Sequence, residues 1–478
     1  MKKTIDNIKF LKNILGFSCP IFIGALFSIV SIPIATRIFE PSELGKINLF
    51  IIYSSVLTCL GSLGFDQAYV RFFHEPPNGV TYRILLGWSL IISSLIVIFE
   101  SIFILFFHDR ISINIIGTIS PRLIICLVIY IASSIVLSYA ALTYRMKENI
   151  RMYSIAYIFS VINIKFIYLF SFFAKTTAIN AISFIAIGQC LCAIVMFLML
   201  WNDITFSKKV NINFLIQVAM FSLPLAPTML MTILNNSISQ LIINKYLSYA
   251  MVGLYSSAVS MAGLISLVQG GFNIYWTAFV WKNYKTEQTL IQMVHHLITF
   301  VMLITALFII LSQDFIYYFL GSSYRASKIF FPFLIIPPIA YTISETTGLG
   351  IGISKKTYFH FFITILTILI NICLCVWLIP KFSLVGAALS SSVAALVRLF
   401  MFTFIGEKYY ICVNNFPKLC LGIGILFISA VCNVLFFNII FIKYIIIFIF
   451  IIITCLLYKS QAVCILSFIK KLAHTREL

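Results

Sequence analysis

The feature that most constrains this chain is a succession of about fourteen apolar segments, each long enough to cross a lipid bilayer. A membrane-spanning helix needs roughly 17–25 predominantly apolar residues. Hydrophobic residues make up 62% of the 478 residues and charged residues only 10%, so a soluble globule of this size could not cover its apolar surface. The sequence therefore predicts an all-α integral membrane protein.

The expected spans cover residues 14–36, 45–65, 84–107, 123–144, 153–174, 178–201, 214–240, 252–274, 294–311, 329–353, 358–379, 385–405, 418–437 and 444–458. The first span follows four lysines, as a signal peptide would, but it is longer than a signal-peptide apolar region and has no small-residue cleavage site. We expect it to be retained as the first transmembrane helix.

The positive charge of the chain is distributed unevenly between the two sides of the membrane. Of the 33 Lys and Arg residues, with those at the ends of spans counted in the adjoining loop, 21 fall in the termini and loops of one side and 10 in the opposite loops, and only Lys165 and Arg398 lie in the interior of expected helices. The positive-inside rule then places both termini in the cytoplasm. The net charge of +19 lies in short loops beside apolar spans, where anionic lipid headgroups neutralise it, and no basic face with interleaved aromatics predicts nucleic-acid binding.

The chain contains no recognisable catalytic or metal site. Phosphate-loop, zinc-protease and serine-hydrolase motifs are missing from the sequence, so we expect neither an enzyme nor a cofactor. Nearly all of the twelve cysteines lie in apolar segments, and pairs such as Cys190 and Cys192 diverge on a helix. The adjacent His295 and His296 also point in different directions. We expect packing and interfacial roles for these residues.

A weak internal repeat divides the chain into two lobes. Three pairs of landmarks recur at a spacing of 207 or 208 residues: Pro20 with Pro227, Gly45 with Gly253, and Gly64-Phe65 with Gly271-Phe272. The repeat predicts a six-helix lobe over residues 1–205, a second over residues 206–410, and two additional helices with a cytoplasmic tail over residues 411–478. Because six helices return the chain to its starting side, the lobes are parallel repeats.

Four segments together resemble the polysaccharide-export flippases, the O-antigen repeat-unit translocases of the multidrug/oligosaccharidyl-lipid/polysaccharide exporter superfamily. They are the run Gly61-Ser62-Leu63-Gly64-Phe65-Asp66-Gln67-Ala68-Tyr69-Val70-Arg71-Phe72, Val252-Gly253-Leu254-Tyr255-Ser256, Gly350-Ile351-Gly352-Ile353-Ser354-Lys355-Lys356-Thr357, and Ile379-Pro380 followed by Val385-Gly386-Ala387-Ala388-Leu389. They occur in the expected order and cover most of residues 1–406.

The resemblance implies a two-lobed transporter of the bacterial inner membrane whose central cavity opens to either face in turn. The implied cargo is an undecaprenyl-pyrophosphate-linked oligosaccharide of O-antigen or capsule type, moved from the cytoplasmic to the periplasmic leaflet. Besides this lipid and the surrounding membrane lipids, the implied partners are the polymerase and the chain-length regulator of the same pathway.

Four charged residues lie in the interior of expected spans: Glu100, Lys165, Glu345 and Arg398. A charge at mid-span costs roughly 2.5–3.5 kcal/mol on an insertion scale, so each should face protein or a wet cavity. Lys165 and Arg398 either line the cavity as binding groups for a pyrophosphate, or are neutralised within their own lobes by Glu100 or Glu345, or reach an interface. Both interpretations remain open from the sequence.

The remaining candidates lie at the ends of the first two helices. Arg71 and Arg37 are candidate phosphate contacts or headgroup anchors.

Glu345 is the better candidate for ion coupling and Glu100 the weaker. The membrane potential supplies a driving force without ATP, because each charge is worth about 2.3 kcal/mol per 100 mV.

Three alternatives compete with a flippase. A multidrug or cation antiporter of the same superfamily needs acidic residues in its cavity, and only Glu100 and Glu345 are available within spans. A glycan polymerase or ligase needs a large external loop, which the sequence does not contain. A scaffold that only recruits partners leaves the buried charges unexplained.

Overall fold

The computed structural model describes residues 19–20, 22–24, 26–76, 80–205, 212–356, 358–464 and 467. Every regular element within these ranges is a helix. The chain divides into two compact units, Met1–Ser257 and Ala258–Leu478. The predicted lobe boundary at residues 205 and 206 is drawn from the sequence repeat and stays a prediction.

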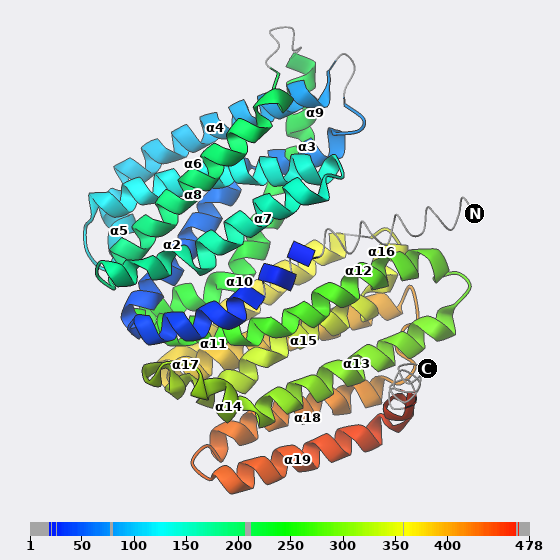
Figure 1. Ribbon diagram of the computed structural model, residues 1–478. Helices are drawn as coiled ribbons and strands as arrows, with labels where there is room; N and C mark the ends of the chain where they lie inside the picture. Colours follow the sequence, from blue (N-terminus) through cyan, green and yellow to red (C-terminus); the bar gives the residue numbers. More distant parts are fainter. Residues whose placement is uncertain are drawn as a thin grey trace, which may run out of the picture. The chain divides into compact units, whose positions relative to one another are not determined.

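The first unit is a bundle of long helices with short connections (Figure 1). An apolar helix at Phe22–Ile38 precedes α2 (Pro41–Ser62), α3 (Phe65–Phe72), α4 (Tyr82–Phe106), α5 (His108–Ile116), α6 (Pro121–Met146), α7 (Ile150–Lys165), η1 (Ile167–Phe173), α8 (Ala178–Leu200), η2 (Trp201–Asp203), α9 (Ile212–Ser222), α10 (Ala226–Tyr246) and most of α11 (Tyr249–Ala262). Helix α6 packs against α8, α7, α2 and α4, so it forms the centre of the unit.

The landmark glycines of the first unit lie where backbones approach closely. Helix α2 ends because Leu63 and Gly64 adopt left-handed conformations, with φ angles of 42° and 78°. A Cβ atom on Gly64 would lie 2.6 Å from the Ser222 carbonyl oxygen. Only glycine therefore suits this position, both for its φ angle and for its close contact.

The repeat-related Gly45 and Gly253 make a reciprocal contact. A Cβ on Gly45 would lie 1.9 Å from the Tyr249 carbonyl oxygen, and a Cβ on Gly253 would lie 1.9 Å from that of Pro41. Pro41 and Tyr249 are themselves 208 residues apart, so the contact maps onto itself when the repeats are exchanged. A self-complementary contact of this kind is what two segments related by a two-fold axis make. The contact therefore agrees with the weak repeat seen in the sequence.

The second unit contains the end of α11, η3 (Gly263–Ile265), α12 (Ser266–Asn283), α13 (Gln288–Leu311), α14 (Gln313–Tyr318), η4 (Ser322–Ile329), α15 (Phe331–Thr347), α16 (Leu349–Ile353), α17 (Tyr358–Glu407), α18 (Phe416–Leu435) and α19 (Ile440–Leu457). Helix α17 is kinked at Ser383, whose φ and ψ angles of 51° and −131° are not helical, three residues after Pro380. Proline removes a backbone donor and bends a helix.

Eleven helices of the described chain are long and apolar enough to cross a membrane, or up to 12 if the bent pair of η4 and α15 is one span. The predicted count of fourteen is not confirmed. The 50-residue α17 covers two predicted spans in one kinked helix, and Phe22–Ile38 is shorter than the other spans. Helix boundaries also differ from prediction: α6 covers Pro121–Met146 where residues 123–144 were expected, and α19 begins at Ile440 where residue 444 was expected. Arg122, Arg145 and Lys443 therefore also lie inside helices, and the expectation that only Lys165 and Arg398 do so is wrong.

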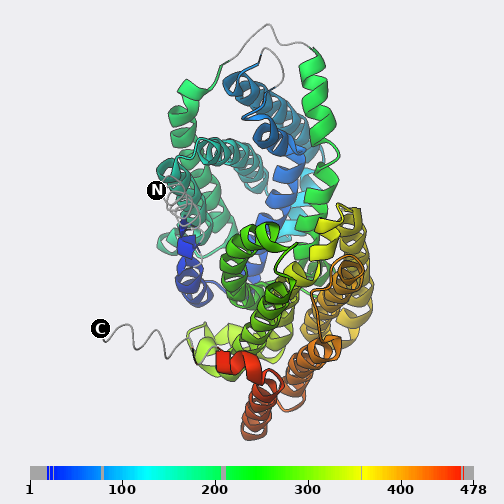
Figure 2. The same cartoon turned by 90° about the vertical axis from the view of Figure 1, so that its right-hand side faces the viewer.

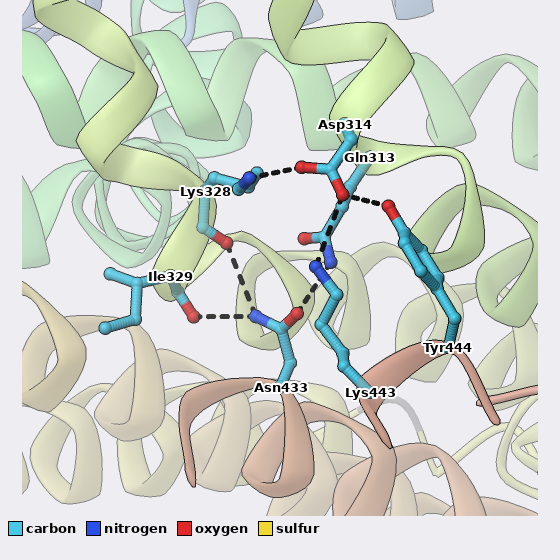
Figure 3. Close-up of polar contacts among 7 residues, drawn as sticks. All are labelled: Gln313, Asp314, Lys328, Ile329, Asn433, Lys443 and Tyr444. Atoms are coloured by element: carbon cyan, nitrogen blue, oxygen red, sulfur yellow. Dashed lines mark hydrogen bonds and ion pairs between the residues drawn. The ribbon is translucent and has the colours of Figure 1, made fainter. Parts of the chain in front are cut away.

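The two additional helices, α18 and α19, form a hairpin against α13 and α15 (Figures 1 and 2). Asp314 of α14 accepts hydrogen bonds from Lys328, from Tyr444 and, at 3.3 Å, from Lys443 (Figure 3). Beside it, the buried Gln313 donates to Asn433 at 2.6 Å. This group of residues, called the Asp314 cluster below, ties the hairpin to the rest of the second unit.

Candidate functional site

A cavity of about 240 Å³ in the second unit holds two of the predicted site residues. Four elements contribute to its wall: α12, α15, α16 and α17. The lining residues are Trp276, Val280, Trp281, Ser344, Glu345, Gly348, Leu349, Gly352, His360, Arg398 and Phe402. Glu345 and Arg398, which are 53 positions apart in the sequence, thus face one cavity.

Glycines bring the helices of this cavity together. A Cβ on Gly350 would lie 2.0 Å from the Gly406 carbonyl oxygen, and a Cβ on Gly406 would lie 2.2 Å from that of Thr347. A Cβ on Gly348 would lie 2.7 Å from a ring carbon of Phe402. The end of α15 and all of α16 can therefore lie directly against α17, which carries Arg398.

Arg398 is held by aromatic rings rather than by a carboxylate. Its guanidinium carbon lies 4.5 Å from the centre of the Tyr341 ring and 4.9 Å from that of Phe402. Among the described residues, no carboxylate oxygen lies within ion-pair distance, 4.0 Å, of Arg398. Stacking on aromatic faces stabilises the cation without neutralising it, so its charge remains available to a ligand.

Glu345 lies one turn from the end of α15, and its side chain is exposed to the cavity. Its backbone carbonyl accepts a hydrogen bond from the indole nitrogen of Trp276 at 3.3 Å. Trp276 is itself 2% exposed and stacked on Phe272. These contacts fix the backbone of Glu345 and leave its carboxylate facing the cavity.

His360 and Trp281 also line this cavity and were not identified from the sequence. His360 stands near the start of α17, and its ring packs edge-on against Phe402, with 4.9 Å between centroids. Both residues lie close to span ends, where histidine and tryptophan are ordinary interfacial residues. No local sequence signal distinguishes them.

The other predicted residues lie in the first unit. Lys165 is the last residue of α7, partly exposed, where the helix changes to η1, and no carboxylate of the described chain pairs with it. Arg71 pairs with Glu75 at 3.0 Å, and both side chains are more than half exposed. Arg37 is exposed near the end of the helix at Phe22–Ile38.

Glu100 differs from Glu345 in having a buried carboxylate. Both of its carboxylate oxygens are buried, with no hydrogen-bond partner among the described residues. Gly61 of α2 lies beside this carboxylate: a Cβ on Gly61 would lie 3.3 Å from Oε2 of Glu100. Neither Glu100 with Lys165 nor Glu345 with Arg398 forms an ion pair within 4.0 Å in the described part of the chain.

A buried amide network in the first unit was also missed from the sequence. Asn163, which is fully buried, donates to Gln189 at 2.6 Å, and Gln189 donates to Ser134 at 3.1 Å. These polar residues connect α7, α8 and α6 in the manner of interhelical hydrogen bonds in membrane bundles. The described residues contain no group of three or more His, Cys, Asp or Glu arranged to hold a metal ion.

Comparison with known families identifies the chain's relatives. The model of a family described as "Polysaccharide biosynthesis protein" matches residues 34–329. The chain belongs to this family. The match covers the first unit from residue 34 onward and continues into the second unit as far as Ile329, the last residue of η4. A comparison with curated proteins finds no sequence match.

Solved structures show which fold this member of the polysaccharide biosynthesis protein family has. The lipid II flippase MurJ in an inward closed conformation aligns with a TM-score of 0.71 and 17% identity, over 93% of this chain and 99% of MurJ. An inward-facing multidrug resistance transporter of the MATE family aligns with a TM-score of 0.56 and 14% identity, over 83% of this chain and 97% of that one. The chain therefore has the two-lobed fold of these transporters.

Proposed function

We propose that this protein is a flippase that moves an undecaprenyl-pyrophosphate-linked oligosaccharide, of O-antigen or capsule type, from the cytoplasmic to the periplasmic leaflet of the bacterial inner membrane. Membership of a polysaccharide biosynthesis family supports a glycan cargo. The likeness to MurJ and to a MATE transporter supports transport by alternating access on this fold. The polymerase and the chain-length regulator of the same pathway are the proposed partners.

The observation that carries the proposal is the state of Arg398. A guanidinium that lies over two aromatic rings inside a membrane-spanning bundle, with no carboxylate within 4.0 Å among the described residues, can bind an anion. Arginine binds phosphate oxygens through two parallel hydrogen bonds. A pyrophosphate supplies such oxygens, and it compensates the cost of holding the charge within the membrane.

Three cations of the first unit are proposed to contact the same cargo at other stages. Lys165 lies at the break between α7 and η1 without a carboxylate partner in the described chain. Arg71 and Arg37 are exposed at helix ends, where they suit a first contact with a charged headgroup. Arg71 must release the exposed Glu75 to do so, which costs little because surface ion pairs are weak.

The proposed energy source is the membrane potential or an ion gradient. A pyrophosphate diester with about two negative charges gains roughly 4–5 kcal/mol per 100 mV on leaving a negative cytoplasm. If protons are coupled, Glu345 is the proposed titrating group, because it shares the cavity of Arg398. Glu100 is the second candidate, because it is buried and unpartnered in the described structure.

The proposal is tested with purified protein in proteoliposomes that contain a labelled undecaprenyl-pyrophosphate oligosaccharide. An imposed potential should move this lipid across the bilayer without ATP, and the Arg398→Gln variant should lose the movement. Lys381→Gln is the matched control, because it removes a cation of the same helix whose ammonium lies over the Trp377 ring, outside the cavity. A wild-type protein that moves no lipid under a potential or an ion gradient contradicts the proposal.

The second candidate is a cation antiporter. It is favoured by the exposed carboxylate of Glu345 in the cavity and by the likeness to a MATE transporter. An organic cation would contact both Glu345 and the flat surface of Trp281. Export of a cationic dye by the same proteoliposomes, abolished in Glu345→Gln while the lipid stays in place, would establish this function in place of the flippase.

A further inference from the structure

The wall of the cavity that carries Trp281 presents an uncovered aromatic surface. The Trp281 side chain is 52% exposed although it lines the cavity. The residue beside it is Gly352, and a Cβ there would already lie 3.6 Å from two atoms of the indole. A larger side chain at Gly352 would extend over this ring, so glycine leaves the indole open to whatever occupies the cavity.

Polar groups surround this aromatic surface. The Glu345 carboxylate and the His360 imidazole are both exposed and line the same cavity as Trp281. A carboxylate accepts hydrogen bonds, and an imidazole can donate one and accept another. A flat apolar ring with hydrogen-bonding groups at its edge matches a sugar, which has an apolar C–H face and a rim of hydroxyl groups.

The size of the cavity limits what it can hold. Its volume of about 240 Å³ is below the roughly 300–1,000 Å³ of pockets that enclose drug-sized ligands. This volume accommodates a single sugar ring, and the rest of an oligosaccharide repeat unit would extend out of the cavity. Arg398 faces the same cavity, so the ring that reaches Trp281 is the one adjacent to the phosphate.

We infer that Trp281, with Glu345 and His360, forms a subsite for the first sugar of the cargo, the one bonded directly to the pyrophosphate. This inference rests on the proposed function and deepens it. Arg398 binds the phosphate that every such carrier lipid shares, whereas Trp281 contacts the sugar that differs between them. Selection between carriers then depends on the Trp281 wall and leaves the distal sugars of the repeat unit free to vary.

The test is equilibrium binding to the full-length protein in nanodiscs. The probes are undecaprenyl pyrophosphate alone and a panel of the same lipid carrying one hexose or one N-acetylhexosamine. The wild-type protein should bind at least one glycosylated lipid about tenfold more tightly than the bare carrier. Trp281→Ala should remove this preference and leave the bare carrier's affinity unchanged, Trp281→Phe should retain part of it, and Arg398→Gln should weaken every probe.

Trp377→Ala is the matched control. Trp377 is also on the second unit and 60% exposed, but it lies outside the cavity, so both affinities should equal those of the wild type. The inference is wrong if the wild-type protein shows no preference for any glycosylated lipid, or if Trp281→Ala leaves the preference intact or weakens both probes equally. These results leave the proposed function standing, which fails instead if the wild-type protein moves no lipid-linked oligosaccharide in proteoliposomes.

Discussion

At the scale of single residues, some cations of this structure pair with carboxylates, whereas Arg398 contacts aromatic rings. Lys328 and Lys443 both contact Asp314, and Arg71 contacts Glu75. Arg398 instead lies on the Tyr341 and Phe402 rings beside a cavity. A cation on aromatic faces is stabilised by roughly 0.5–2 kcal/mol per contact and keeps its charge for a ligand.

We expect Arg398→Lys to retain the charge but to lower lipid transport about tenfold, because lysine cannot stack its ammonium on two rings or form a paired contact with a phosphate. Arg398→Gln should abolish transport. The measurement is potential-driven movement of the labelled lipid at matched protein abundance. Equal transport by wild type and Arg398→Gln would assign Arg398 a purely structural role.

The sequence predicted that Glu345 and Arg398 matter but not that they share a cavity. Charged residues in apolar spans are visible in any sequence because they are costly. Their grouping depends on the contact between α16 and α17, which Gly350 and Gly406 create and which no helical periodicity encodes. Trp281 and His360 were missed because aromatic residues near span ends carry no distinguishing signal.

At the scale of helices, close glycine contacts position the elements of the site. The backbone of α16 meets that of α17 at Gly350, where a Cβ would lie 2.0 Å from a carbonyl oxygen. The sequence predicted most helices of this bundle, because apolar length is a strong signal. It did not predict that two spans join in the kinked α17, because a proline such as Pro380 can either end a helix or bend it, and the sequence alone does not distinguish the two outcomes.

We expect Gly350→Ala to destabilise the second unit by about 1–3 kcal/mol, the usual cost of overpacking, and to lower transport by displacing α16 from α17. Gly424→Ala in α18 is the matched control, because nothing lies within 4 Å of its Cβ position. Alanine there should be neutral or stabilising by up to about 1 kcal/mol. Thermal unfolding in detergent measures both, and equal behaviour of the two variants would refute the close-packing argument.

The Asp314 cluster holds the hairpin of α18 and α19 against the rest of the second unit. Asp314→Asn removes the carboxylate partner of Lys443, whose side chain is 1% exposed. Loss of a partner by a buried charge costs roughly 3–5 kcal/mol, an upper bound here because the Asp314 side chain is 33% exposed. We expect faster hydrogen exchange in α18 and α19. Glu75→Gln is the control. It removes the carboxylate of an exposed ion pair, so hydrogen exchange in α18 and α19 should not change.

The same cluster should resist mild acid. Burial acts to raise the pKa of Asp314, but the hydrogen bond from Lys328 and the charges of Lys443 and Lys328 outweigh it, so this pKa lies below its ordinary value of 3.8. A depressed folded-state pKa gives stability that is fully present above the unfolded-state pKa and lost as the pH falls through the folded-state value. Exchange of α18 and α19, corrected for intrinsic rates, should therefore be the same at pH 7 and pH 5.

At the scale of the whole molecule, the repeat and the charge distribution determine how the chain would work in a membrane. The reciprocal contact of Gly45 and Gly253 shows that the two repeats are equivalent at one point of the structure. Repeats with the same topology are related by an axis along the membrane normal, so exchanging them leaves the two faces of the membrane distinct. The direction of transport then depends on which face is cytoplasmic, and only the loop charges bear on this.

We predict that both termini and the loop containing Lys355 are cytoplasmic, because 21 of the 33 Lys and Arg residues fall on that side. In intact cells, a membrane-impermeant thiol reagent should not label Lys355→Cys, whereas it should label Arg110→Cys, an exposed position beyond the opposite end of α4. After permeabilisation both should react. The wild-type chain reports the background of its own twelve cysteines. Labelling of Lys355→Cys in intact cells would invert the topology and contradict the assignment of both termini to the cytoplasm.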